Sequence, residues 1–205
     1  MTIVDADVAR RFGWTMVDLA SAFLEGGASL LQLRAKEAPS GWMLETASAI
    51  VERSHQAKAL VIVNDRADIA RLSGADGVHV GQDDLSPAAV RRVLAADALV
   101  GLSTHTDEQV EAALLQPVSY IAIGPVFQTG TKSTGYDSRG LEAVQRAAAR
   151  AGGRGLPLVG IGGVTLETAP DVLRAGASSV AVIGDLMVGR DPAARVREYL
   201  KRLTV

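Results

Sequence analysis

The chain has 205 residues, a formal charge of −2, 4% aromatic residues and no cysteine. This length suits one domain with a sizeable core, and the near-neutral charge gives no broad basic surface for nucleic acid. The absence of cysteine excludes disulfides and thiolate chemistry and fits a cytoplasmic protein. No apolar run approaches the roughly 20 residues that span a bilayer, and the first residues lack a signal-peptide pattern, so we expect no membrane segment or leader.

Short apolar runs alternate with alanine-rich helical stretches along the chain. Strands are expected at residues 2–4, 30–34, 60–63, 77–80, 99–103, 120–123, 158–161 and 179–182. Helices are expected at residues 15–25, 41–56, 68–72, 87–94, 107–115, 141–150, 166–174 and 192–203. Because a helix follows each strand, the pattern predicts a parallel sheet with helices packed around it. No linker interrupts the alternation, so we expect one domain over residues 1–205.

Helix ends carry recognisable signals. Ser86 and Asp191 each precede a proline, which is typical of an N-cap followed by the first helical residue. Thr106, with a glutamine three residues later, fits a capping box. Gly74 and Gly176 follow predicted helices, where a left-handed C-terminal cap favours glycine.

Polar or glycine-rich segments follow most of the predicted strands. They are Gln32-Leu33-Arg34-Ala35-Lys36, Asn64-Asp65, Asp83-Asp84, residues 124–132 and Gly160-Ile161-Gly162-Gly163. An open doubly wound sheet would concentrate such residues in one βα turn, so their spread favours a closed (β/α)8 TIM barrel with its site at the C-terminal rim. The first strand begins almost at Met1, so either the barrel has an open base or the natural chain has further residues before Met1.

The second predicted strand places Gln32, Arg34 and Lys36 on one face, because strand side chains alternate. Polar groups that point into a barrel need a ligand or a partner. One interpretation is a phosphate clamp in which Arg34 binds in bidentate fashion and Lys36 supplies a point charge. The other is a network of internal salt bridges to carboxylates across the barrel.

Two acidic pairs follow neighbouring strands. Asn64-Asp65 and Asp83-Asp84 each fit a turn or a helix cap, but together at one rim they suit Mg²⁺ held by carboxylates and substrate phosphate. We select Asp65 and Asp84 as the metal ligands and expect Asp83 to face solvent.

The histidines do not form a catalytic triad with a serine and an aspartate in any identifiable order. His79 lies within a strand, where a hydrogen-bonded core histidine is the simpler interpretation. His105 follows the fifth strand and either contacts substrate or orients a loop. Ser103 is better placed to face inward.

A second phosphate site is expected on the opposite strands. Thr129, Thr131 and Lys132 lie in the long segment 128–140, and glycines end the seventh and eighth strands. The loops after these two strands form the usual phosphate site of a barrel, because glycine lets backbone amides approach an anion closely.

These segments, in this order over nearly the whole chain, resemble the thiamin phosphate synthase family. The resembling motifs are Gln32-Leu33-Arg34-Ala35-Lys36, Val63-Asn64-Asp65, residues 77–84, residues 101–105, residues 124–132 and Gly160-Ile161-Gly162-Gly163. The resemblance implies a Mg²⁺-dependent transferase that couples a pyrimidine diphosphate to a thiazole phosphate. Thiamin phosphate and pyrophosphate are the products, formed through a carbocation-like displacement.

The resemblance also assigns roles to residues. Those implied for the pyrimidine diphosphate are Gln32, Arg34, Lys36, Asn64, Ser103 and Lys132. Those implied for the thiazole phosphate are Thr129, Thr131, Gly163, Ile183 and Gly184. Asp65 and Asp84 would bind the metal, and the catalytic groups would be Arg34, Lys36, Ser103 and Lys132.

Gly184-Asp185 departs from the pattern, because many relatives carry Ser-Ala there. We therefore expect a missing hydroxyl and an added carboxylate near the thiazole phosphate.

The alternatives to the synthase function are a thiazole tautomerase of the same superfamily, a sugar-phosphate isomerase using His105, and a non-catalytic phosphate-binding barrel. Pro125 stands where the tautomerase branch places a catalytic histidine, which favours the synthase. The alanine-rich outer helices also leave a homo-oligomer open.

Overall fold

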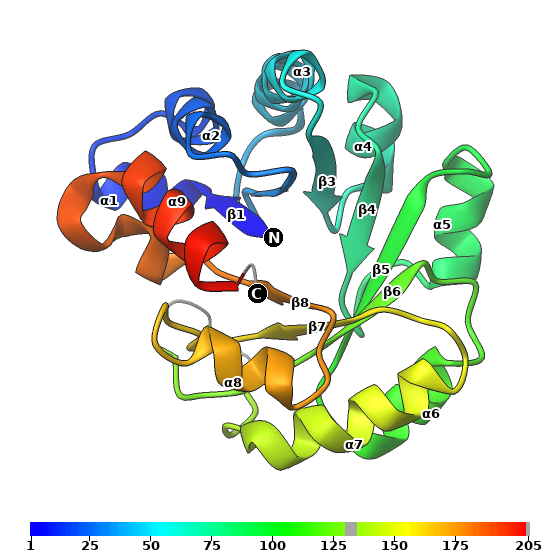
Figure 1. Cartoon of the computed structure of the whole chain (residues 1–205). Helices are drawn as coiled ribbons and strands as arrows, with labels where there is room; N and C mark the ends of the chain where they lie inside the picture. Colours follow the sequence, from blue (N-terminus) through cyan, green and yellow to red (C-terminus); the bar gives the residue numbers. More distant parts are fainter. Residues whose placement is uncertain (130–134, 204–205) are drawn as a thin grey trace.

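A computed structural model describes residues 1–129 and 135–203 of the chain. Eight parallel strands form one sheet in the order of the sequence (Figure 1). The strands are β1 (Thr2–Asp5), β2 (Leu30–Arg34), β3 (Leu60–Asn64), β4 (Gly77–Val80), β5 (Leu99–Thr104), β6 (Tyr120–Ile123), β7 (Leu158–Ile161) and β8 (Ser179–Ala181). This arrangement confirms the predicted TIM barrel.

The sheet closes between its first and last strands. Thr2 forms a parallel bridge with Val182. The Ile3 amide donates to the Val182 carbonyl at 3.0 Å, and the Val182 amide donates to the Met1 carbonyl at 3.1 Å. Because all eight strands run parallel in a closed ring, their C-terminal ends lie at one rim.

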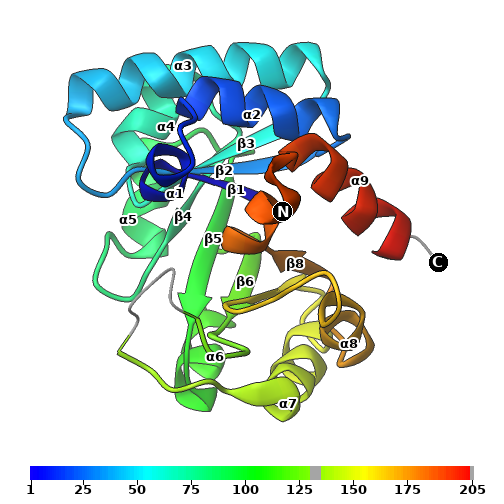
Figure 2. The same cartoon turned by 90° about the vertical axis from the view of Figure 1, so that its left-hand side faces the viewer.

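Helices surround the strands on the outside of the barrel (Figures 1 and 2). The α-helices are α1 (Ala6–Arg11), α2 (Met16–Glu25), α3 (Ser40–Gln56), α4 (Ala67–Ser73), α5 (Pro87–Val93), α6 (Asp107–Ala113), α7 (Gly140–Gly152), α8 (Ala169–Arg174) and α9 (Pro192–Leu203). A 3-10 segment, η1 (Gly184–Arg190), lies between β8 and α9. Within residues 1–129 and 135–203, none of the helices has the length and apolar character that crossing a bilayer requires.

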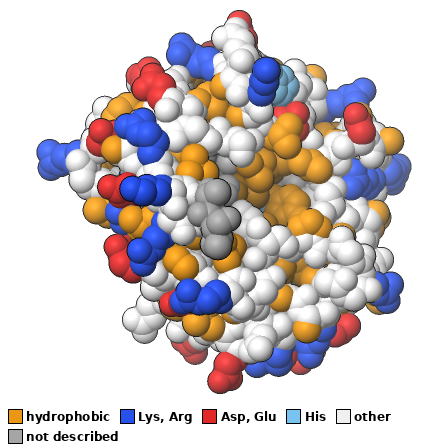
Figure 3. Space-filling model, viewed as in Figure 1, with side chains coloured by type: hydrophobic (Ala, Val, Ile, Leu, Met, Phe, Trp, Pro, Cys, Tyr) orange, Lys and Arg blue, Asp and Glu red, His pale blue; other side chains and the backbone are white. Residues whose placement is uncertain are grey.

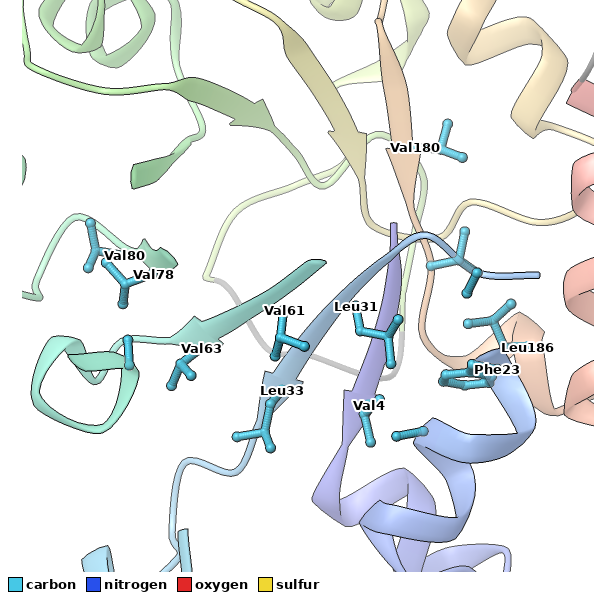
Figure 4. Packing of buried hydrophobic residues seen from close by; sticks show 14 of the residues in the cluster. Val4, Phe23, Leu31, Leu33, Val61, Val63, Val78, Val80, Val180 and Leu186 are labelled. Carbon is cyan, nitrogen blue, oxygen red and sulfur yellow. The ribbon is translucent and has the colours of Figure 1, made fainter. Parts of the chain in front are cut away.

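The two faces of each strand serve different layers. Leu31 and Leu33 are fully buried and pack outward with Phe23 and Leu186 in the large cluster between strands and helices (Figure 4). Gln32, between them, is buried in the barrel interior. A smaller inner cluster contains Ile3, Tyr120, Ala122, Val159 and Ala181. Because side chains alternate along each strand, the larger apolar core lies between the strands and the helices. The side chains that point inward include polar residues such as Gln32.

The predicted helix caps are confirmed by their hydrogen bonds. Ser86 Oγ accepts from the Ala89 amide at 3.3 Å, Thr106 Oγ1 accepts from the Gln109 amide at 3.2 Å, and Asp191 Oδ1 accepts from the Ala194 amide at 2.8 Å. Gly74, directly after α4, and Gly176, two residues after α8, have positive φ angles of 73° and 103°. The strands and the long helices lie where the sequence predicted them.

The sequence pattern did not predict two short elements, α1 and η1. The helix α1 follows β1 without a linker, because Asp5 Oδ1 caps it by accepting from the amides of Asp7 and Val8. The 3-10 segment η1 is interrupted by non-helical backbone angles at Val188 and Gly189, so it shows no continuous helical period. The helix α8 also begins later than expected, at Ala169.

Met1 lies at the end of the barrel where the strands begin. Its ammonium donates to the Val180 carbonyl at 2.8 Å, and burial lowers the pKa of this ammonium to about 6. Its side chain packs against the inner cluster. Figure 2 shows the C-terminus at the right and the N-terminus near the middle, with α1 to its left. Figure 3 views the end with the termini, where apolar side chains line a hollow near the centre.

We expect Phe23→Ala to lower the free energy of unfolding by about 3–5 kcal/mol, because the ring is fully buried and its removal leaves a cavity. Urea denaturation followed by circular dichroism measures the loss. Phe12→Ala is the matched control, since Phe12 is 42% exposed. Equal losses for the two variants would contradict the packing of Phe23 in the core.

Candidate active site

Charged side chains gather at the ends of β2, β3 and β4. Arg34 and Asn64 are the last residues of β2 and β3. Just beyond them, Lys36 Nζ lies 3.3 Å from Asp65 Oδ2. The structure therefore brings four of the predicted residues to one sector of the rim.

Arg34 is held by an aspartate that the sequence interpretation did not select. Its Nη1 donates to Asp5 Oδ2, and both side chains are largely buried, with 12% and 2% exposed. This is an internal salt bridge, but to the neighbouring strand β1 and not to carboxylates across the barrel, as one of the two expectations had it. The Arg34 Nε is also buried, and it has no hydrogen-bond partner within residues 1–129 and 135–203. A buried donor without a partner is costly, so the guanidinium is both oriented and able to bind an anion.

Gln32 lies deeper than the other predicted clamp residues. Its side chain is buried, and its Nε2 lies 3.4 Å from Met1 Sδ, toward the opposite end of the barrel. Gln32 thus shares a strand face with Arg34, as predicted, but its amide points below the rim.

Asp65 and Asp84 lie next to each other. Asp65 has a φ of 65°, a left-handed conformation that Asp tolerates better than most residues, and its amide donates to the His79 carbonyl at 2.8 Å. Asp84 Oδ2 accepts from the Gly81 amide at 2.7 Å. Burial raises the pKa of Asp65, and the nearby Asp84 carboxyl raises it further, while Lys36 lowers it. Asp83 is exposed, as expected.

Adjacent carboxylates of this kind fit a hard divalent cation, which prefers oxygen ligands. The residues that the structure describes hold no group of three or more His, Cys, Asp or Glu side chains able to bind a metal ion. A cation at Asp65 and Asp84 would therefore need further oxygen ligands, such as water or substrate phosphate.

A buried polar network lies inside the barrel below the rim. His79 Nδ1 is 3.0 Å from the Tyr120 hydroxyl, and His79 Nε2 is 2.8 Å from Ser103 Oγ. The His79 and Tyr120 rings stack with centroids 5.5 Å apart. The prediction of a hydrogen-bonded core histidine is confirmed, and this histidine orients Ser103, which faces inward as expected.

A cavity of about 390 Å³ occupies the other half of the rim, at the ends of β5 to β8. Five of the predicted ligand-binding residues line it: Ser103, Thr129, Gly163, Ile183 and Gly184. The residues that line it include no lysine or arginine within the described part of the chain. Thr131 and Lys132, also predicted here, lie outside the described residues.

Close contact between two loops shapes this cavity. The Phe127 amide donates to the Gly162 carbonyl at 2.9 Å, so the segment after β6 pairs with the end of β7. Gly163 has a φ of 65°, and a Cβ there would lie 2.4 Å from the Gln128 carbonyl oxygen. Only glycine permits this approach, which brings the segment carrying Thr129 against the loop after β7.

His105 helps to hold the same segment. Its Nδ1 lies 2.5 Å from the Gly124 carbonyl oxygen, and its ring stacks on Tyr136 with centroids 4.3 Å apart. These contacts support the expected role of His105 in orienting the loop. Because His105 also lines the cavity, the second expected role, contact with substrate, stays a prediction.

The rim thus has a charged half on β2 to β4 and a half on β5 to β8 whose described lining residues include no lysine or arginine. Sequence interpretation found residues of both halves but missed Asp5, although Asp5 ends a strand like the other selected residues. It also missed Arg195 and Tyr199 of α9, whose contacts with Asp185 have no local sequence signal.

Comparisons with known proteins identify the family of this chain. The family model described as thiamine monophosphate synthase matches residues 1–186. A thiamine-phosphate synthase from Koribacter versatilis (strain Ellin345) is 42% identical over 209 residues, covering 98% of this chain and 93% of that protein. Another, from Synechococcus sp. (strain WH7803), is 41% identical over 189 residues and 92% of this chain, which spans about half (52%) of that relative.

A solved structure gives the same result for the fold. Thiamine phosphate pyrophosphorylase from Pyrococcus furiosus superposes with a TM-score of 0.87 at 29% sequence identity, covering 98% of this chain and 93% of that one. The family model and these relatives all extend over most of the barrel, including both halves of the rim. The chain therefore belongs to the thiamine monophosphate synthase family.

Proposed function

We propose that this protein couples 4-amino-2-methyl-5-hydroxymethylpyrimidine diphosphate to a thiazole phosphate, giving thiamin phosphate and pyrophosphate. The observation that carries the proposal is the division of one rim into two halves. A highly charged leaving group suits the half with Arg34, Lys36 and two carboxylates. A single phosphate suits the half lined by hydroxyls and glycine amides.

The reaction needs no general base. The bond between the pyrimidine methylene carbon and the diphosphate oxygen breaks, and the thiazole nitrogen forms a new bond to that carbon. Neither bond involves hydrogen, so no proton has to move. The work of the site is to stabilise the negative charge of departing pyrophosphate and to align the nucleophile with the methylene group.

We assign the charged half to the leaving group. Arg34 binds pyrophosphate oxygens through the donors that Asp5 leaves available, and Lys36 adds a second cation. Asn64 and Gln32 contact the pyrimidine diphosphate, and Lys132, which lies outside the described residues, is assigned to the same diphosphate by its place in the sequence motif. Ser103, oriented by His79, contacts the pyrimidine ring.

We assign Mg²⁺ to Asp65 and Asp84. The two adjacent carboxylates supply oxygen ligands of the right type, and the substrate diphosphate would complete the set. Bound there, Mg²⁺ would neutralise charge on the leaving pyrophosphate. Lys36 contacts Asp65 and so lies close enough to share the same diphosphate.

The second half binds the thiazole phosphate. Thr129 offers a hydroxyl donor, and Gly163, Ile183 and Gly184 offer backbone amides. Thr131, outside the described residues, is assigned here by its place in the sequence motif. A thiazole tautomerase would use this half alone. The charged half therefore supports coupling of two phosphorylated substrates over isomerisation of one.

The direct test is incubation of the purified protein with both substrates and Mg²⁺, followed by mass spectrometry. We expect thiamin phosphate and pyrophosphate to appear in equal amounts. A folded protein that forms neither product under these conditions would overturn the assignment. Release of an isomerised thiazole phosphate would support the tautomerase instead.

Metal dependence tests the two carboxylates. We expect EDTA to abolish coupling and Mg²⁺ to restore it, and Asp65→Asn to lower kcat/KM on the order of a hundredfold, because a ligand that helps neutralise the leaving group is lost. Asp83→Asn is the matched control, since Asp83 is an exposed neighbour of Asp84. Full activity in EDTA, or equal losses for the two variants, would reject the metal site.

The salt bridge beneath the clamp gives a third test. We expect Asp5→Asn to lower kcat/KM by roughly tenfold to a hundredfold, because Arg34 loses the partner that fixes its orientation. Asparagine caps helices as well as aspartate, so α1 keeps its N-cap. Asp7→Asn, at an exposed pair with Arg10, serves as the control. Wild-type kinetics for Asp5→Asn would show that Arg34 needs no such partner.

A further inference from the structure

Asp185 is a buried charge for which the proposed reaction has no use. It follows Gly184 at the start of η1 and borders the cavity of the second half. Only 11% of its side chain is exposed. A carboxylate in this position should repel a phosphate, unless a neighbouring cation compensates its charge.

The contacts of Asp185 remove this conflict. Its Oδ2 accepts from Arg195 Nη2 at 2.9 Å, from Arg195 Nε at 3.1 Å and from the Tyr199 hydroxyl at 2.6 Å. Burial and the neighbouring carboxylate raise the pKa of Tyr199, so its hydroxyl remains a donor. Arg195, itself 11% exposed, compensates the charge. The carboxylate expected to oppose the thiazole phosphate is therefore already paired.

The same oxygen also joins the two loops of the cavity. Asp185 Oδ2 accepts from the Leu166 amide at 3.2 Å, and Leu166 lies in the loop between β7 and α8. Gly163 lies three residues earlier in that loop, and Gly184 is the direct neighbour of Asp185. One carboxylate thus connects the loop after β7 to the first turn of η1, and α9 anchors it from outside.

Binding of an anion by backbone amides depends more on a fixed spacing between these two loops than binding by long charged side chains would. The described residues that line the cavity include no lysine or arginine, so the donors that these residues offer to an anion are mainly backbone amides and hydroxyls. The amides come from two different loops, and their hydrogen bonds weaken steeply when distance or angle changes. The spacing between the loops therefore controls how well both reach one phosphate.

We propose that Asp185, anchored by Arg195 and Tyr199, is a positioning residue that sets the affinity for the phosphate of the thiazole substrate. It acts by fixing the loop after β7 against the start of η1. The inference rests on the proposed function, since it concerns the second substrate of that reaction.

The test is the double variant Asp185→Ala/Arg195→Leu, which removes both charges and so leaves no unpaired ion in the protein interior. We expect KM for thiazole phosphate to rise about tenfold, which corresponds to the loss of one or two hydrogen bonds. We expect KM for the pyrimidine diphosphate to stay within about twofold, because the charged half is untouched. Tyr199→Phe, which removes one donor to Asp185, should give a smaller rise of about threefold.

The matched control is Asp171→Ala/Arg174→Leu, an ion pair of the same residue types exposed on α8. We expect it to leave both KM values unchanged. Thermal unfolding of all variants separates lost stability from lost affinity, since general destabilisation would not raise KM for one substrate alone. Unchanged KM for thiazole phosphate in the double variant, or equal rises for both substrates, would overturn the inference.

Calorimetric titration with thiazole phosphate alone separates this inference from the proposed function. If the wild-type protein binds thiazole phosphate and the double variant binds it about tenfold more weakly, the inference holds even without product formation. If the two proteins bind it equally, or the wild-type protein does not bind it, the inference fails whether or not coupling occurs.

Discussion

Parallel pairing of eight strands into a closed ring determines where each functional group of this protein lies. The bridge between Thr2 and Val182 completes the ring. Closure sends the C-terminal end of every strand to one rim, and the alternation of side chains turns every second residue inward. Without it, Arg34 on β2 and Gly163 after β7 would lie on separate edges of an open sheet.

Each half of the rim carries a buried ion pair between an aspartate and an arginine. Asp5 holds Arg34 in the charged half, where the arginine faces the proposed leaving group. Arg195 holds Asp185 in the other half, where the aspartate faces the protein. A buried charge is costly alone, and its partner also fixes its orientation. A buried Asp–Arg pair thus holds the Arg34 guanidinium toward the leaving group in one half. In the other half, such a pair holds the Asp185 carboxylate away from the phosphate.

The parts of this architecture that depend on local sequence pattern could be predicted from the sequence. Strand and helix alternation, the caps at Ser86 and Thr106, and the polar ends of β2 to β4 all follow from residue type and spacing. The sequence was insufficient for side-chain contacts between elements that are far apart along the chain. Asp5 and Arg34 are 29 residues apart, and nothing near either one indicates the other. The carboxylate of Asp185 was predicted to face the phosphate because its partners on α9 could not be read from periodicity.

Two anion sites in separate halves of one rim are the basis of the proposed chemistry. A crystal structure with thiamin phosphate, pyrophosphate and Mg²⁺ bound would test this most directly. We expect pyrophosphate beside Arg34 and Lys36, the metal between Asp65 and Asp84, and the single phosphate beside Gly163 and Gly184. Both anions in the same half, or a metal bound away from the two carboxylates, would contradict the proposal.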